Sequence, residues 1–98
     1  MFWRGSASVT IKYFADIRGL TGRTEQPWTK AAPTLHALLA ELVREYGAPF
    51  EKRVFEGGRL SSTIIILING QNLEHLSGLE TPLGPEDVVV FFPMVAGG

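Results

Sequence analysis

The sequence closes with Glu86-Asp-Val-Val-Val-Phe-Phe-Pro-Met-Val-Ala-Gly-Gly98, in which an apolar run meets a proline and then a tail with two glycines. Residues 87–92 are mostly β-branched and aromatic, which favours a strand, and Pro93 is expected to end it. Every position from 88 to 92 is apolar, as in strands that are covered on both faces. We therefore predict a final strand that needs two covered faces, followed by a flexible tail at 94–98.

The glycines at 97 and 98 make the tail chemically informative. Glycine has no side chain, so such a tail can enter a narrow channel and place a bare α-carboxylate inside another protein. That carboxylate can be activated as an acyl-adenylate and then converted into a thiocarboxylate or an amide. Chance places two glycines together at a given position about 0.5% of the time, and chain ends are often frayed. The tail alone leaves a reactive end and an inert end both open.

The preceding segments predict a small mixed sheet. Residues 63–68 (Thr-Ile-Ile-Ile-Leu-Ile) have strong strand character, and Asn69-Gly70 favours a type I′ hairpin that returns briefly. Residues 8–14 alternate between apolar and polar side chains, which indicates a half-buried strand, and residues 23–28 can form a second one. We expect the first and last strands to run parallel and adjacent.

One helix is expected between these strands. Thr34 is a suitable N-cap, and Gly47 is placed to end the helix. Between them the apolar positions form one helical stripe: Leu35, Leu38, Leu39, Leu42, Val43 and Tyr46. The order predicts an α+β fold, a mixed sheet of four to five strands with one main helix packed on one face. One helix cannot cover both faces, so either segment 48–60 or a partner must shield the second.

Composition bounds the kind of protein. The chain has 98 residues, of which 45% are hydrophobic and 19% charged, so we expect one folded domain at 1–93. The sequence has no cysteine, which excludes disulfides, thiolate metal sites and cysteine nucleophiles. The longest apolar runs are five residues, too short to span a membrane, and no signal peptide is apparent. We therefore expect a soluble, cytoplasmic protein.

The charge is unevenly distributed. All nine Lys and Arg residues lie at or before Arg59, whereas residues 60–98 carry only acids: Glu74, Glu80, Glu86 and Asp87. No basic stripe suited to nucleic acid is visible, so nucleic acid is not expected as a partner. The anionic half that carries the tail favours a partner with a basic groove.

Several segments in one order resemble the ubiquitin-like, β-grasp sulfur carriers of the MoaD/ThiS family, and the MoaD branch most of all. The matching stretches are Val9-Thr-Ile-Lys-Tyr-Phe-Ala15 with Arg18 and Gly22-Arg23, Thr34-Leu35, Ile66-Leu-Ile-Asn-Gly70, Thr81-Pro-Leu83 and Glu86–Gly98. Segment 57–79 is similar to that of the longer variants found in archaea and some thermophilic bacteria. Met94 departs from the family pattern, which usually has a second proline there.

The resemblance implies a mechanism. A MoeB/ThiF-like enzyme would use ATP to adenylate the carboxylate of Gly98, and a persulfide sulfur donor would replace AMP to leave a thiocarboxylate. Gly97 would be a steric requirement for this reaction. As the small subunit of molybdopterin synthase, the chain would then insert its tail into a MoaE-like large subunit and donate sulfur to a pterin, for a molybdenum or tungsten cofactor. The chain itself would bind no cofactor and would be a co-substrate, not an enzyme.

The docking residues and two other function classes follow from the same residues. Strand alternation sends Phe91 and Phe92 to opposite faces, so at least one of them, with Met94 and Val95, is a candidate for partner docking. The first alternative function is another sulfur carrier or a ubiquitin-like modifier, for tRNA thiolation, thiamine or cysteine synthesis, or lysine conjugation. The second alternative is a β-grasp interaction module with an inert tail.

Overall fold

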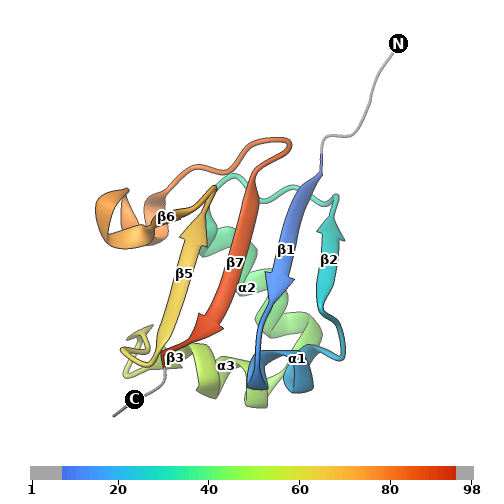
Figure 1. The fold of residues 1–98 in the computed structure, drawn as a ribbon, viewed down its shortest axis with the longest axis vertical. Helices are drawn as coiled ribbons and strands as arrows, with labels where there is room; N and C mark the ends of the chain where they lie inside the picture. Colours follow the sequence, from blue (N-terminus) through green and yellow to red (C-terminus); the bar gives the residue numbers. More distant parts are fainter. Residues whose placement is uncertain (1–7, 95–98) are drawn as a thin grey trace.

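The computed structural model describes residues 8–94 of the chain, which form one mixed sheet with its helices gathered on one side (Figure 1). The elements follow the order β-α-β-α-α-β-β-β-β-β, with two short 3-10 turns before the last strand. Their bounds are β1 Val9–Tyr13, α1 Asp16–Thr21, β2 Glu25–Trp28, α2 Leu35–Tyr46, α3 Ala48–Val54, β3 Phe55–Glu56, β4 Arg59–Leu60, β5 Ile64–Ile68, β6 Gln71–Asn72, η1 Leu73–His75, η2 Gly78–Glu80 and β7 Val88–Pro93.

The main sheet has five strands in the order β2-β1-β7-β5-β6, so the first and last strands are neighbours at its centre. β1 runs parallel to β7, with Ile11 opposite Val89 and Tyr13 opposite Phe91. β5 and β2 are antiparallel to their neighbours, and β3 and β4 form a separate two-stranded hairpin. This confirms the predicted parallel pair and the α+β architecture with one main helix on a mixed sheet.

Helix α2 forms where the apolar stripe predicted it. The Oγ1 atom of Thr34 accepts a hydrogen bond from the Ala37 amide at 3.1 Å, and Gly47 ends the helix with φ of 81°. Four leucines of the stripe are fully buried against the sheet: Leu35, Leu38, Leu39 and Leu42. The helix therefore supplies the centre of the core.

Helices α1 and α3 lie on the same side of the sheet as α2 (Figure 1). Phe50 and Val54 of α3 are fully buried, and the Phe50 ring lies 6.1 Å from that of Phe91 on the helix-covered side of the sheet. Helix α3 thus lies within segment 48–60, which was one of the two predicted ways of covering the second face. It does not shield the second face of the sheet, so the first of the two predicted ways of covering that face is wrong for the described residues.

Polar groups inside the fold are paired through one amide. The Oε1 atom of Gln26 accepts hydrogen bonds from the hydroxyls of Tyr13 at 2.7 Å and Tyr46 at 2.8 Å, which joins β1, β2 and the end of α2. Burial raises the pKa of Tyr13 well above its usual value, and it also raises the pKa of Tyr46. Both phenols therefore stay protonated and donate to Gln26 throughout the neutral range.

The hairpin between β5 and β6 has the predicted turn. Asn69 and Gly70 both have positive φ, 53° and 85°, as a type I′ turn requires. Asn69 also joins two strands, because its Nδ2 donates to Asp87 and its Oδ1 accepts from the Val88 amide, both at 2.9 Å. Within residues 8–94 no helix is long and apolar enough to cross a membrane.

Candidate docking site at the root of the tail

The sheet has one face that no helix of the described residues covers, and we call it the open face. Side chains alternate along each strand, so Ile64, Ile66 and Phe91 point to the helices and are buried, while their neighbours point away. The open face is apolar and comprises Phe14, Ile65, Leu67, Val90, Phe92 and Met94. Phe14 is 41% exposed and Met94 is 51% exposed, which is unusual for large apolar side chains.

The two adjacent phenylalanines of β7 point to opposite faces of the sheet. Phe91 is fully buried, with its ring 5.7 Å from that of Tyr13, so it is not the member of the predicted pair that is free to contact a partner. The alternation of the strand directs it to the helices. Phe92 points to the open face and is half-buried, so it stays a docking candidate together with the exposed Met94.

The reactive positions of the tail are not placed by the structure. Val95, Gly97 and Gly98 lie outside the described residues, so the docking prediction for Val95 and the chemical predictions for both glycines stay predictions.

Phe14 belongs to this site although the sequence did not single it out. Its ring meets Phe92 edge to face at 6.1 Å, and the Arg18 guanidinium lies 5.4 Å from its centre. Arg18 is itself fixed, because its Nε donates to the carbonyl of Tyr13 at 3.0 Å. The signal in the sequence was the alternation of 8–14, which places position 14 on the same face as Lys12 one step beyond the strand.

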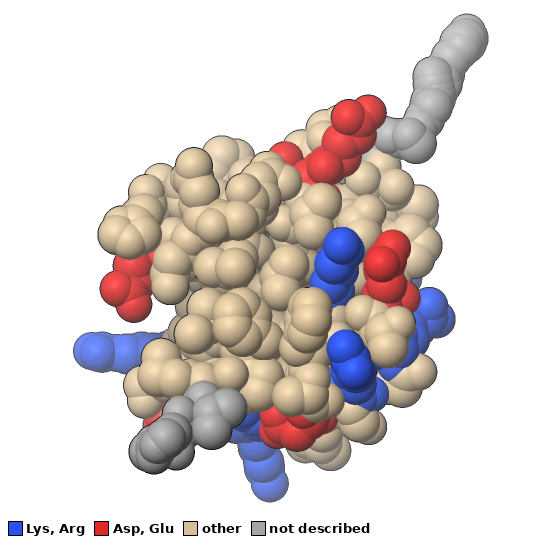
Figure 2. All heavy atoms as spheres, viewed as in Figure 1, with Lys and Arg blue, Asp and Glu red and all other residues tan. Residues whose placement is uncertain are grey.

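Charges border the open face on one side. Lys12 lies opposite Val90 in the register of β1 and β7, and Arg18 covers Phe14, so both cations flank the apolar surface on its β1 side. Figure 2 shows Lys and Arg side chains there, beside a broad uncharged area over β5 and β7. Asp87 precedes β7, at the end of that strand opposite to Met94. The tail therefore begins far from that acid, beside an apolar face whose β1 side carries charges of both signs, since Glu25 of β2 lies opposite Lys12.

A polar network fixes the point from which the tail leaves the sheet. The Met94 amide donates to the carbonyl of Thr63 at 2.9 Å. The Oγ1 of Thr63 accepts from Arg53 Nη1 at 3.0 Å and shares a 2.8 Å hydrogen bond with the Ser61 hydroxyl. Arg53 in turn donates to Asp16 at 2.8 Å, and this hydrogen bond lowers the pKa of the Asp16 carboxyl. Side chains of α1 and α3 and of the turn just before β5 therefore fix the position of Met94.

Comparison with known proteins identifies the family. A profile described as the ThiS family matches residues 11–98. Small archaeal modifier protein 3 of Haloferax volcanii is 33% identical over 89 residues, which are 90% of this chain and 96% of that protein. A protein of Archaeoglobus fulgidus that is provisionally named a sulfur carrier is 40% identical over 65 residues, 66% of this chain and 74% of that protein.

Solved structures share the whole fold. The solution structure of small archaeal modifier protein 1 from Methanosarcina acetivorans is 36% identical with a TM-score of 0.77, over 96% of this chain and all of that one. A Pyrococcus furiosus structure provisionally named subunit 1 of a molybdopterin converting factor is 28% identical with a TM-score of 0.73, over 92% of this chain and 100% of that one. The sheet order, the helix on one face and the profile agree: the chain belongs to the ThiS family and is a ubiquitin-like, β-grasp protein of the sulfur carrier and modifier class.

Proposed function

We propose that the chain carries sulfur as a thiocarboxylate on Gly98. The observation that carries the proposal is the tail root: Met94 leaves the sheet beside an uncovered apolar face, in a chain whose family match continues through residue 98. No cysteine is available to hold the sulfur as a persulfide on this chain. We therefore assign the sulfur to the carboxyl group of Gly98.

The reaction divides between this chain and its partners. A MoeB/ThiF-like enzyme joins the Gly98 carboxylate to the AMP part of ATP and releases pyrophosphate, which makes the acyl carbon electrophilic. A persulfide on the sulfur donor attacks that carbon and expels AMP. A second thiol then cleaves the sulfur–sulfur bond and leaves the terminal sulfur on Gly98. This chain supplies the carboxylate and its position, and ATP is bound by the partner, so the chain is a co-substrate.

The geometry gives the tail a defined reach. The four residues after Met94 extend about 13 Å from the anchor at Thr63. A partner that binds the open face can therefore receive Gly98 in a buried active site while the folded domain stays on the partner's surface. Phe14, Phe92 and Met94 are the proposed contacts, and a partner that complements Lys12 and Arg18 carries acids on that side.

For the destination of the sulfur we propose molybdopterin, with this chain as the small subunit of molybdopterin synthase and a MoaE-like protein as the large subunit. The proposal is supported by the likeness to the Pyrococcus furiosus structure named for a molybdopterin converting factor. The sulfur on Gly98 would be transferred to a pterin precursor in the active site of the large subunit.

A second candidate is protein modification. The relatives from Haloferax volcanii and Methanosarcina acetivorans are named small archaeal modifier proteins, and both match nearly the full length of this chain. In that case the same activated Gly98 would form an amide with a lysine of a target protein. Other sulfur destinations, such as tRNA thiolation or thiamine and cysteine synthesis, use the same first step.

Intact-mass spectrometry tests the common step and separates the outcomes. The chain is incubated with a MoeB/ThiF-like enzyme, ATP and a persulfide donor, and replacement of oxygen by sulfur adds about 16 Da. A chain that lacks Gly98 should stay unmodified and keep its melting temperature, and loading of this truncated chain would refute the assignment. Addition of a MoaE-like subunit and a pterin precursor should then remove the gained mass, whereas an added protein mass would favour the modifier.

A further inference from the structure

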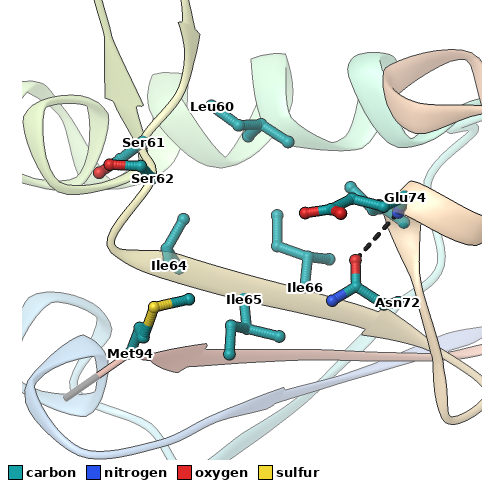
Figure 3. A pocket seen from close by; sticks show the side chains of 10 residues that line it. Leu60, Ser61, Ser62, Ile64, Ile65, Ile66, Asn72, Glu74 and Met94 are labelled. Atoms are coloured by element: carbon teal, nitrogen blue, oxygen red, sulfur yellow. Dashed lines mark hydrogen bonds between the residues drawn. The ribbon is translucent and has the colours of Figure 1, made fainter. Parts of the chain in front are cut away.

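A groove runs along the outer edge of β5, on the side away from β7. It has a volume of about 320 Å³ and lies between the β4 end and the η1 turn. Figure 3 shows Ile64 and Ile66 pointing from β5 toward Leu60 across the groove, with Ile65 and Met94 on the other side of the strand. The groove therefore has an apolar centre on strand β5, with Ser61 and Ser62 at one end and Asn72 and Glu74 at the other.

The backbone of this strand is incompletely paired. The Thr63 carbonyl and the Asn69 amide both bond to β7, so the alternation of an antiparallel ladder directs Ile64 and Ile66 to the opposite edge. On that edge β6 pairs only with Leu67 and Ile68. On this outer edge, no strand of residues 8–94 pairs with Ile64–Ile66. The Ile64 amide is satisfied locally by the Ser61 carbonyl at 3.3 Å.

The local sequence lacks the features that usually prevent another strand from pairing with an edge. Proteins commonly protect an edge strand with lysine, proline, a bulge or an inward-pointing charge. Residues 63–68 contain no charged residue and no proline, and the β5–β7 register continues without a bulge. An open, apolar edge of this kind is a template for another strand.

One end of the groove carries a negative charge. The Glu74 carboxylate projects over the groove near Ile66 (Figure 3). The backbone of Glu74 is fixed because the Asn72 Oδ1 accepts from the Glu74 amide at 2.9 Å. No ion pair of the described residues uses Glu74, and residues 60–94 contain no lysine or arginine to neutralise it. A basic side chain in the occupant would complement this charge.

We propose that the β5 edge at Ile64–Ile66 is a strand-addition site for an extended segment of a partner protein, apolar at its centre and carrying one Lys or Arg next to Glu74. The occupant bonds to the outward carbonyl of Ile64 and to the outward backbone groups of Ile66, and it buries its apolar side chains against Leu60 and Leu73. Three residues of open edge span about 10 Å, so the segment is short. The site adjoins the open face at Ile65 and Met94, but it uses the backbone edge of β5 and does not depend on the tail chemistry.

The test uses two capped peptides, acetyl-Thr-Val-Ile-Val-Arg-Thr-amide and the same peptide with Glu in place of Arg. Titration of the isotopically labelled chain should shift the Ile66 amide most with the Arg peptide, and the Glu peptide should bind about threefold or more weakly. Glu74→Lys should reverse this preference. Glu80→Lys, which changes an exposed acid on the other 3-10 turn, should leave it unchanged.

A third peptide tests the backbone contact. Methylation of the central amide nitrogens of the Arg peptide removes ladder donors and should abolish the Ile66 shift. Equal binding of the Arg and Glu peptides, or shifts confined to the open face, would overturn the proposal. Hydrogen exchange of the Ile66 amide in the free chain gives a further check. The proposal would also be overturned if protection of this amide rises with protein concentration, or if the protection disappears when residues 95–98 are deleted. Those results would assign the groove to a second copy or to the chain's own tail.

Discussion

The rings of Phe14 and Phe92 meet edge to face, 6.1 Å apart, on the face of the sheet that the helices leave uncovered. The two residues are distant in sequence, and the parallel pairing of β1 with β7 brings them together. Arg18 holds Phe14 from the other side. The pair is thus pre-organised, so a partner that binds it loses little side-chain entropy.

Replacement of Phe92 by arginine should weaken binding to the adenylating enzyme without unfolding the domain. An aromatic anchor in an interface contributes about 2 kcal/mol or more, and a charge at this position would have to be desolvated. Phe91→Arg is the contrasting variant, because Phe91 is fully buried and the charge would enter the core. Calorimetric titration and a thermal melt of both variants make the comparison. Wild-type affinity of a folded Phe92→Arg chain would place docking elsewhere.

Truncation of Leu39 to alanine should cost about 2–5 kcal/mol of unfolding free energy, because the side chain is fully buried between α2 and the sheet. Leu83→Ala is the comparison, since Leu83 packs against the core from a loop and is only partly buried. Urea unfolding of both variants measures the difference. A Leu39→Ala chain that is no less stable than Leu83→Ala would show that α2 is not the centre of the core.

Two glycines should respond to alanine in opposite directions. Gly70 has φ of 85° in the β5–β6 turn, where an L side chain is strained by about 1–2 kcal/mol. Gly19 lies in α1 with open space around its Cα, so alanine should stabilise that helix by about 0.5–1 kcal/mol. Melting temperatures of the two variants give the sign of each effect. A stabilised Gly70→Ala chain would contradict the observed turn.

The ion pair of Asp16 with Arg53 should make the free energy of unfolding depend on pH in the acid range. The Arg53 hydrogen bond lowers the pKa of Asp16 from its ordinary 3.8, so the folded state binds that proton less readily than the unfolded state. The resulting stabilisation is present above the ordinary pKa and is lost as the pH falls through the lowered value. Asp16→Asn should therefore be less stable than wild type at about pH 6, and the gap should close near pH 2.

Urea unfolding at a series of pH values measures this gap. The effect is expected to be small because the Asp16 side chain is 58% exposed. A difference that persists unchanged in acid would mean that Asp16 acts through packing and not through its charge.

Helix α2 and the sheet pairs were predictable because their signals are strong and local. Six apolar positions repeat at helical spacing between Thr34 and Gly47, and Asn-Gly specifies one hairpin turn. Helix α1 was not predicted. Its six residues, Asp16–Thr21, include Gly19 and stop at Gly22 with φ of 74°. Such a short segment with a glycine has little helical signal of its own, and packing of the buried Ile17 stabilises it.

The candidate site was predictable only in part. Alternation showed that Phe91 and Phe92 face opposite ways, but an all-apolar strand does not reveal which face the helices cover. The register of β7 on β1 decides this, because Phe91 lies beside the buried Tyr13. Phe14 was missed since its exposure depends on that same pairing. The brief return of β6 was predicted, but the open β5 edge was missed because the sequence does not show that no other strand pairs there.

The position of β7 has a consequence for protein synthesis. β7 is the last described strand to leave the ribosome, yet it is the central strand of the sheet, between β1 and β5. A nascent chain that stops before residue 88 has neither the central strand nor Phe92, so its remaining strands cannot form the five-stranded sheet. Fragments released before β7 is made therefore lack both the complete sheet and the Phe14–Phe92 pair of the open face.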